Sequence, residues 1–225
     1  MDTRNLTLAG LVFEAKFEPN LAVTNYFSDL QQEIKGDYQL REFIYHRVDF
    51  ANRKNTETMF FSIENIGLTT MIVKDKHEKI KEIKNLLEFA EKSGLKKFTR
   101  IGIRTDIVVP IKESDLSKEM EIFFTKFFGK QAIKQLGNSI GEFELKLSSI
   151  DDQYKYILNF KFAEREDKDN AELKYLPKLG LVCDTDCYKD EVSIEEAYDF
   201  VSHAMDASIN RIRNFLSNFL VRSEK

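Results

Sequence analysis

The 225-residue sequence has no tryptophan and only two cysteines, Cys183 and Cys187. Nineteen phenylalanines without a tryptophan indicate an aromatic interior and not an aromatic binding cage. If both cysteines lie on one strand, their Cα atoms are about 13 Å apart, whereas a disulfide requires about 7 Å or less. We therefore expect two free thiols, which is typical of a cytosolic protein.

The sequence also lacks the common motifs of catalysis. Gly129-Lys130 has neither the upstream glycine nor the following Ser or Thr of a phosphate-binding loop, and no serine-centred elbow occurs. His46, His77 and His203 stand at no metal-ligand spacing to one another or to a cysteine. These absences argue against nucleotide hydrolysis, serine hydrolysis and zinc chemistry.

Long apolar runs and a basic excess are missing as well. No run approaches the roughly 20 residues that a membrane span needs, and the first apolar run already contains Glu14 and Lys16, unlike a signal peptide. The net charge is -4 and the isoelectric point is about 5.6, whereas proteins that bind phosphate backbones are usually basic. We expect a cytoplasmic protein without membrane association, and the charge argues against nucleic acid as a partner.

Hydrophobic periodicity predicts the same order of elements twice. Residues 7–93 and 98–221 each follow the order strand, helix, three strands, helix. Because three consecutive strands usually form an antiparallel meander, we expect an α+β fold with two β-α-β-β-β-α halves. Their largely antiparallel sheets are joined or packed together, with helices on one face and a long C-terminal helix. The halves are residues 1–95 and 96–225, arranged as two units or one compact domain.

Three local signals set boundaries within these halves. Residues 41–50 are predicted as a single strand, and Asn65-Ile66-Gly67 as the turn of a hairpin. Ser193 and Glu196 form a capping box, so the last helix is predicted to begin there and to continue to about residue 221.

Residues 98–111 form the clearest predicted strand, because apolar and polar side chains alternate along it. One face carries Ile101, Ile103, Ile107, Val109 and Ile111, and the other carries Arg100, Gly102, Arg104 and Asp106. One face of this strand therefore belongs to a core, and the other presents two guanidinium groups and a carboxylate.

The last predicted strand offers partners for these arginines. Asp184 and Asp186 share one face of it, and two arginines opposite two aspartates would form a charge-assisted network across the sheet. Such a network either has a structural role, in which it ties the two halves together or fixes the strand register, or it builds a binding site. In the second case, Arg100, Arg104 and Asp106 would bind a small anionic ligand or a nucleotide.

Asp184 and Asp186 also suggest a metal-dependent enzyme as an alternative. Two carboxylates on one strand face can share a Mg²⁺ ion, with Glu14 as a third ligand. Because Asp-x-Asp is a frequent pattern, we predict no cofactor and keep a divalent metal only as this alternative.

The C-terminal helix has an apolar seam that continues to its end. Phe215, Leu216, Phe219 and Leu220 lie in its last turns. The helix either packs on the sheet along its whole length, or these four residues protrude and pair with a second copy or another protein.

Three stretches resemble an uncharacterised, sporadically distributed bacterial family of similar length. The first is the alternating opening that ends in Phe17-Glu18-Pro19. The second is the central strand, where the family pattern Arg-x-Gly-x-Arg-Tyr-x-Asn-x-Ile is matched by Arg100, Gly102, Arg104 and Val109. The third is Leu181 to Tyr188, with its two alternating aspartates, followed by a long helix that carries His203.

Two positions depart from the family pattern. Thr105 replaces its tyrosine and Ile107 its asparagine, so any site that those two residues build in relatives is absent here. The family carries no assigned activity that the resemblance could transfer, and its patchy distribution implies horizontally moved genes, as in defence systems and mobile elements.

Together these observations predict a non-enzymatic protein-interaction or regulatory module, which the resemblance would place as an accessory component of a bacterial defence or mobile-element system. The expected partner is another protein or a second copy. A sensor that uses Arg100 and Arg104, and a metal-dependent enzyme that uses Asp184 and Asp186, are the alternatives.

Overall fold

The computed structural model describes residues 5–34, 38–112, 116–129, 131, 144–151, 154–164 and 174–221, without the side chains of residues 31, 33 and 219–221. The strands in this part of the chain are β1 (Thr7–Lys16), β2 (Tyr38–Ile44), β3 (Arg47–Asn52), β4 (Glu57–Ser62), β5 (Asn65–Thr70), β6 (Lys97–Pro110), β7 (Glu144–Ile150), β8 (Lys155–Glu164) and β9 (Leu179–Ser193). The helices are the 3-10 helix η1 (Leu21–Tyr26), α1 (Phe27–Glu33), α2 (Lys76–Lys92), α3 (Leu116–Phe128) and α5 (Ile194–Val221).

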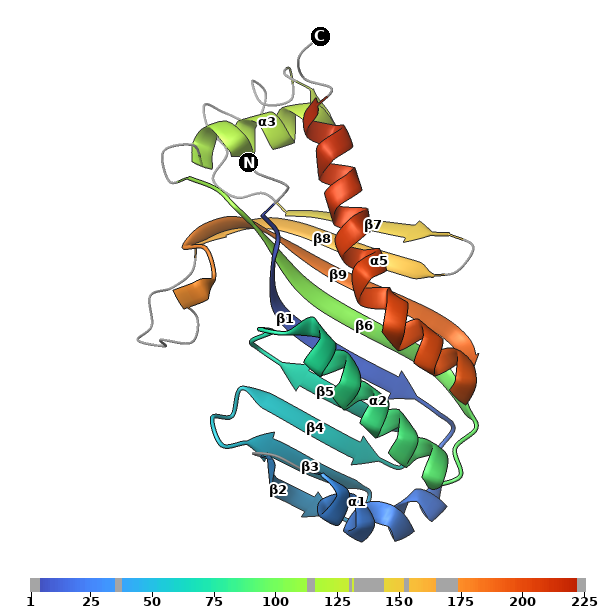
Figure 1. Ribbon diagram of the computed structural model, residues 1–225. Helices are drawn as coiled ribbons and strands as arrows, with labels where there is room; N and C mark the ends of the chain where they lie inside the picture. The colour runs from blue at the N-terminus through green and yellow to red at the C-terminus, as the bar shows by residue number, and fades with distance from the viewer. Residues whose placement is uncertain are drawn as a thin grey trace.

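All nine strands form one antiparallel sheet in the order β2-β3-β4-β5-β1-β6-β9-β8-β7 (Figure 1). In each half of the chain, the first strand pairs with the last strand of that half, and the two first strands, β1 and β6, pair with each other. The predicted α+β class, antiparallel pairing and long C-terminal helix are confirmed. The proposed boundary at residues 95 and 96 falls just before β6, and the β1–β6 pairing makes the sheet continuous across it.

The first half contains one strand more than predicted. The segment 41–50 is not a single strand, because β2 and β3 form a hairpin in which Ile44 pairs with Arg47. Only Tyr45 and His46 form its loop, and neither is a residue that marks a tight turn in a sequence. Among the described residues the first half has five strands and the second has four, and an internal duplication stays a prediction.

The predicted turn at Asn65-Ile66-Gly67 was wrong, because all three residues lie in β5. The chain reverses before them, where the Ser62 hydroxyl accepts hydrogen bonds from the amides of Glu64 and Asn65. Gly67 is a glycine for packing reasons: a Cβ atom there would lie 2.3 Å from the Phe60 ring. A glycine inside a strand can thus mark a position where a neighbouring side chain packs against the backbone, and not a turn.

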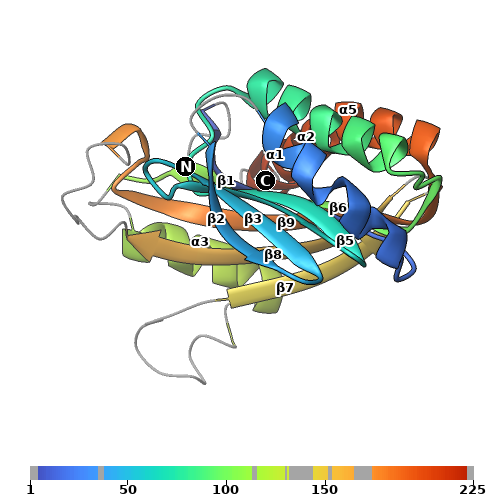
Figure 2. The same cartoon turned by 90° about the horizontal axis from the view of Figure 1, so that it is seen from below.

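Helices cover one side of the sheet, which we call the helix side (Figure 2). α2 and α5 lie next to each other on it, and α1 lies beside α2 near β2 and β3 (Figures 1 and 2). α3 contacts helix-side residues at the end of β8, where Phe123 lies 6.1 Å from Phe160 and 5.7 Å from Phe162 between ring centroids. The opposite side of the central strands we call the open face.

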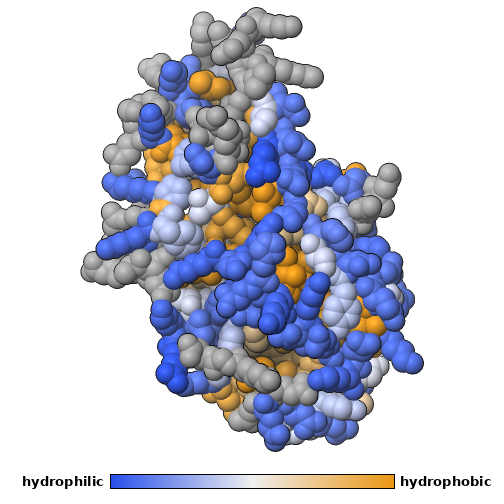
Figure 3. Space-filling view, in the orientation of Figure 1, coloured by the Kyte–Doolittle hydropathy of each residue, from blue (hydrophilic) through white to orange (hydrophobic). Residues whose placement is uncertain are grey.

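Phenylalanine fills much of the core, as the composition predicts. Phe61 packs edge-to-face against Phe27 and Phe89, with ring centroids 6.1 and 4.8 Å apart. Phe13 and Phe98 are fully buried on the central strands. The space-filling view of the helix side shows polar surface on the outer faces of α2 and α5 and apolar surface between α3 and α5 (Figure 3).

The predicted capping box at the start of α5 is confirmed. The Ser193 amide donates to Glu196 Oε2 at 3.0 Å, and the Glu196 amide donates to Ser193 Oγ at 3.2 Å. None of the helices in the described part of the chain is long and apolar enough to cross a membrane.

Candidate functional site

The open face is built by alternation along the central strands. On β6, Ile101, Ile103 and Ile107 are buried on the helix side, so Arg100 and Arg104 point to the other side. β9 alternates in the same way. Its buried helix-side residues are Leu181, Cys183, Thr185 and Cys187, and its open-face residues are Asp184, Asp186, Tyr188 and Asp190.

The structure brings the predicted arginines and aspartates together. Arg104 Nε and Nη2 donate to the two carboxylate oxygens of Asp184 at 2.7 and 2.6 Å, and Arg100 Nη2 donates to Asp186 at 3.0 Å. The register places Arg104 opposite Asp186 and Asp106 opposite Asp184. The Arg104 side chain therefore extends diagonally across the sheet to Asp184, which is two residues from the position directly opposite Arg104. The predicted charge-assisted network is confirmed.

This network is accessible to solvent. The Arg104 side chain is 58% exposed and the Arg100 side chain 40% exposed. Arg100 also lies over the Tyr188 ring, with its guanidinium carbon 4.0 Å from the centroid. A guanidinium that is stacked and paired but still exposed is a common element of protein interfaces.

Further charged side chains extend the network along β8 and β1. Lys155 Nζ lies 2.6 Å from Asp190, beside Tyr188. On β1, Glu14 Oε1 accepts a hydrogen bond from Asn65 at 2.9 Å, and its other oxygen lies 3.6 Å from Lys16. The open face is thus a set of neighbouring positive and negative groups without a single dominant sign.

Asp106 is a partly buried carboxylate of this face. Its pKa is raised by burial and by the neighbouring Asp184, although Arg104 and Lys161 act in the opposite direction. Space for it comes from Gly10 on β1, where an added Cβ would lie 3.0 Å from Asp106 Oδ2. Burial likewise raises the pKa of Asp186, against the effect of Arg100 and Arg104.

The metal alternative gains no support from this geometry. Asp184 and Asp186 share one strand face as predicted, but both of the Asp184 oxygens and one of Asp186 already accept hydrogen bonds from arginine. Glu14 pairs with Asn65 and lies opposite Gly102, whereas Asp184 lies opposite Asp106. Within the described ranges, no group of three His, Cys, Asp or Glu residues could hold a metal ion.

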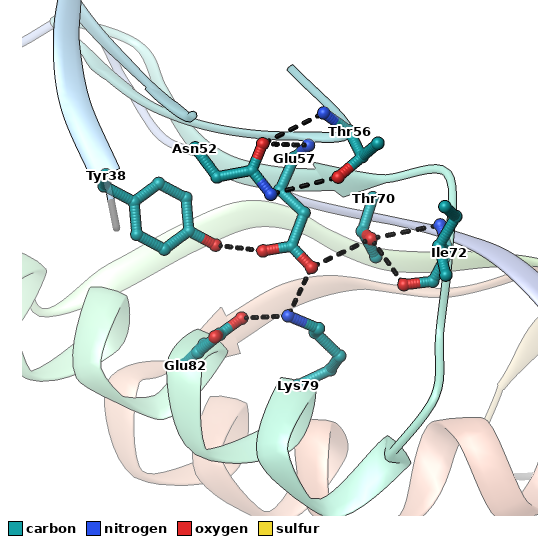
Figure 4. Close-up of polar contacts among 8 residues, drawn as sticks. All are labelled: Tyr38, Asn52, Thr56, Glu57, Thr70, Ile72, Lys79 and Glu82. Carbon is teal, nitrogen blue, oxygen red and sulfur yellow. Dashed lines mark hydrogen bonds and ion pairs between the residues drawn. The ribbon is translucent and has the colours of Figure 1, made fainter. Parts of the chain in front are cut away.

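A second polar cluster, on the helix side, was missed by the sequence analysis (Figure 4). Lys79 of α2 lies 2.5 Å from Glu57 Oε1 and 2.9 Å from Glu82 Oε2. Tyr38 donates to the other Glu57 oxygen at 2.7 Å, and the Thr70 hydroxyl lies 3.2 Å from Oε1. We call these five residues the Lys79 network. The sequence did contain one signal of burial for Lys79. Lys79 precedes Ile83 by four residues, which places both on the buried face of α2.

Burial changes the pKa of several groups in the Lys79 network. It raises the pKa of Tyr38, and the hydrogen bond to Glu57 raises it further. It also raises the pKa of Glu82, against the effect of Lys79. For Lys79, burial lowers the pKa, but hydrogen bonds to Glu57 and Glu82 outweigh it, so the net shift is upward. Lys79 is therefore a charged group held between two carboxylates, which ties α2 to β4.

Of the four predicted interface residues at the C-terminal end of α5, the structure describes the side chains of Phe215 and Leu216. Phe215 stacks between Phe160 and Phe127, at centroid distances of 5.0 and 6.2 Å, and Leu216 is fully buried. Leu216 therefore packs within the chain, whereas Phe215 is only partly buried and also lines a hollow beside α5. The side chains of Phe219 and Leu220 lie outside the described residues.

The cysteines and His203 complete the set of predicted reactive groups. Cys183 and Cys187 are buried free thiols, and burial raises the pKa of Cys187 to about 12. His203 is exposed on α5, with Nδ1 2.8 Å from the Asp199 carbonyl oxygen. Neither arrangement provides an activated nucleophile.

Comparison with known proteins adds no functional assignment: no family model matches the sequence, and no curated protein is significantly similar to it. The resemblance to the sporadically distributed bacterial family therefore stays a prediction.

Proposed function

We propose that this protein is a non-enzymatic interaction or regulatory module that docks another protein on its open face. The observation that carries the proposal is the exposed, internally paired set of arginine and aspartate side chains on β6 and β9. Paired charges of both signs favour a partner with a complementary mixed pattern, because such patterns set specificity more than affinity.

The alternatives have less support. A small-ligand sensor would need a concave site at Arg100 and Arg104. Among the described residues, four hollows lie elsewhere, and neither arginine lines any of them. Nucleic acid would meet carboxylates beside every arginine of the face, and these repel phosphate. An accessory role in defence or on mobile elements stays a prediction from the resemblance.

Site-specific photo-crosslinking in cells tests the proposal. A photoreactive residue at Lys161, which is exposed on the open face, should give one discrete adduct with another protein. The matched control is Glu88, which is exposed on α2 of the helix side and should not give this adduct. The proposal fails if both positions give the same adducts, or if only the Glu88 position crosslinks.

A further inference from the structure

The two edges of the sheet differ in their regularity. At one edge, the β2–β3 register shifts between Leu40 and Glu42, and such a bulge interrupts pairing with an incoming strand. At the other edge, β7 pairs with β8 in an unbroken register from Glu144 to Ile150. β7 also contains no proline or glycine. Of the two edges, β7 is therefore the better template for an additional strand.

Within the described residues, the β7 backbone groups that do not pair with β8 follow from the hairpin. The Asp151 amide donates to the Tyr154 carbonyl oxygen at 3.0 Å, so these two residues form a hydrogen-bonded pair. In an antiparallel ladder such pairs alternate with pairs whose backbone groups point outward. The outward amides and carbonyls of β7 therefore belong to Lys146, Ser148 and Ile150, together with Glu144.

A groove of about 670 Å³ lies between α5 and the β7–β8 hairpin. α5 crosses this end of the sheet diagonally, and β7 lies at its edge (Figure 1). Leu147 and Ser149 of β7 face the helix side and line the groove. Ser148 also lines it although its side chain belongs to the other face, so the groove reaches the backbone at the edge of β7.

The α5 wall of the groove is lined by uncharged amides. Asn210, Asn214 and Asn218 recur every four residues along it, and each amide both donates and accepts hydrogen bonds. The positively charged side chain in the groove, Arg211, already has partners within the chain. Arg211 donates to Ser149 at 2.7 Å, pairs with Asp151, and lies with its guanidinium carbon 3.9 Å above the Tyr156 ring.

We propose that β7 accepts an extended segment of a partner protein as a tenth strand, with alternate side chains of that segment entering the groove beside α5. The edge selects an extended backbone, because its amides and carbonyls repeat at strand spacing. The groove selects uncharged side chains: small polar ones against the asparagines, and an apolar one near Leu147, Leu158 and Phe215. The groove lies on the helix side of β7 and β8, whereas the open-face charges lie on the opposite side of the sheet, so either proposal can fail without the other.

Defined peptides test the proposal on the full chain. An array of uncharged seven-residue peptides, in which threonine alternates with leucine, valine or asparagine, is screened by fluorescence anisotropy. We expect members of the array to bind, and their versions with every amide nitrogen methylated to bind at least about tenfold more weakly, because the backbone donors are lost. In hydrogen exchange, the bound peptide should protect the amides of Lys146, Ser148 and Ile150.

Two variants with matched controls locate the site. Ser148→Pro removes an outward amide without touching the β7–β8 ladder, and Ser148→Ala keeps that amide. Asn214→Lys places a charge in the groove, and His203→Lys places a charge at an exposed position of the same helix outside the groove. We expect both test variants to weaken binding about tenfold and both controls to leave it unchanged. If Ser148→Pro does not fold, Asn214→Lys and the methylated peptides still decide. The proposal is overturned if no peptide binds, if methylation has no effect, or if Asn214→Lys binds normally.

Discussion

Replacing Lys79 by methionine tests the Lys79 network directly. The Lys79 side chain is 6% exposed and lies between Glu57 and Glu82. Methionine keeps most of the side-chain volume but leaves two neighbouring carboxylates without a cation. Removing one partner of a buried ion pair costs about 3–5 kcal/mol. Because Glu57 keeps its hydrogen bonds with Tyr38 and Thr70, we expect the free energy of unfolding to fall by about 3 kcal/mol near neutral pH.

The assay is thermal and urea denaturation followed by circular dichroism. For a chain of this length, a loss of about 3 kcal/mol lowers Tm by about 6–12 °C. The loss should depend on pH. Burial already raises the pKa of Glu82 in the folded protein, and removing Lys79 raises it further. A carboxyl whose folded pKa is raised destabilises the fold above that pKa, and this penalty is lost as the pH falls through it. The variant should therefore recover part of its stability in mild acid.

Two controls separate charge from packing. Lys81 is exposed on the same helix, so Lys81→Met should change the free energy of unfolding by no more than about 0.5 kcal/mol. Adding Glu57→Gln and Glu82→Gln to Lys79→Met removes the uncompensated charges and should restore most of the stability. The reasoning is refuted if Lys79→Met alone costs less than about 1 kcal/mol, or costs the same at every pH.

Three further substitutions test other parts of the structure. Arg104→Ala breaks an exposed ion pair with Asp184, so urea denaturation should show a loss below about 1 kcal/mol, and a loss above about 2 kcal/mol would mean that the pair is effectively buried. Asp106→Asn should stabilise the protein at neutral pH, because burial raises the folded pKa of Asp106 and makes its ionised form unfavourable. This gain should disappear as the pH falls through that pKa, so a gain that is constant with pH would exclude the explanation. Gly67→Ala forces a methyl group against the Phe60 ring and the Phe13 carbonyl oxygen and should cost about 1–3 kcal/mol by thermal denaturation, and an unchanged Tm would refute both close contacts.

The face of the sheet on which a side chain lies was predictable from the alternation of apolar and polar residues. The alternation along residues 98–111 assigned Arg100 and Arg104 to one face of β6, and the structure places them there. The same argument placed Asp184 and Asp186 on one face of β9. Their pairing with the arginines was only a conditional expectation, because the sequence did not predict that β6 and β9 are neighbours in the sheet. Local periodicity was thus sufficient to assign these side chains to a face of their own strand, and the structure supplied the neighbouring strand.

Features that depend on distant contacts were not predictable in this way. The β2–β3 loop at Tyr45 and His46 carries no turn residue, so the pattern suggested one continuous strand. Gly67 resembled a turn residue because the Phe60 ring above it is a neighbour only in the folded sheet. The Lys79 network joins β4 to α2 over a gap of more than twenty residues, and no local pattern reports such a pairing.

The most direct test of the proposed function is a charge swap on the open face. Arg104→Asp combined with Asp184→Arg keeps an ion pair between β6 and β9 but reverses its direction. The swapped protein is compared with the wild type for binding to the partner identified by crosslinking at position 161, with Tm as the measure of folding. Our account predicts that Tm stays within about 3 °C while binding weakens about tenfold or more. A swapped protein that folds normally and binds this partner as tightly as the wild type would contradict it.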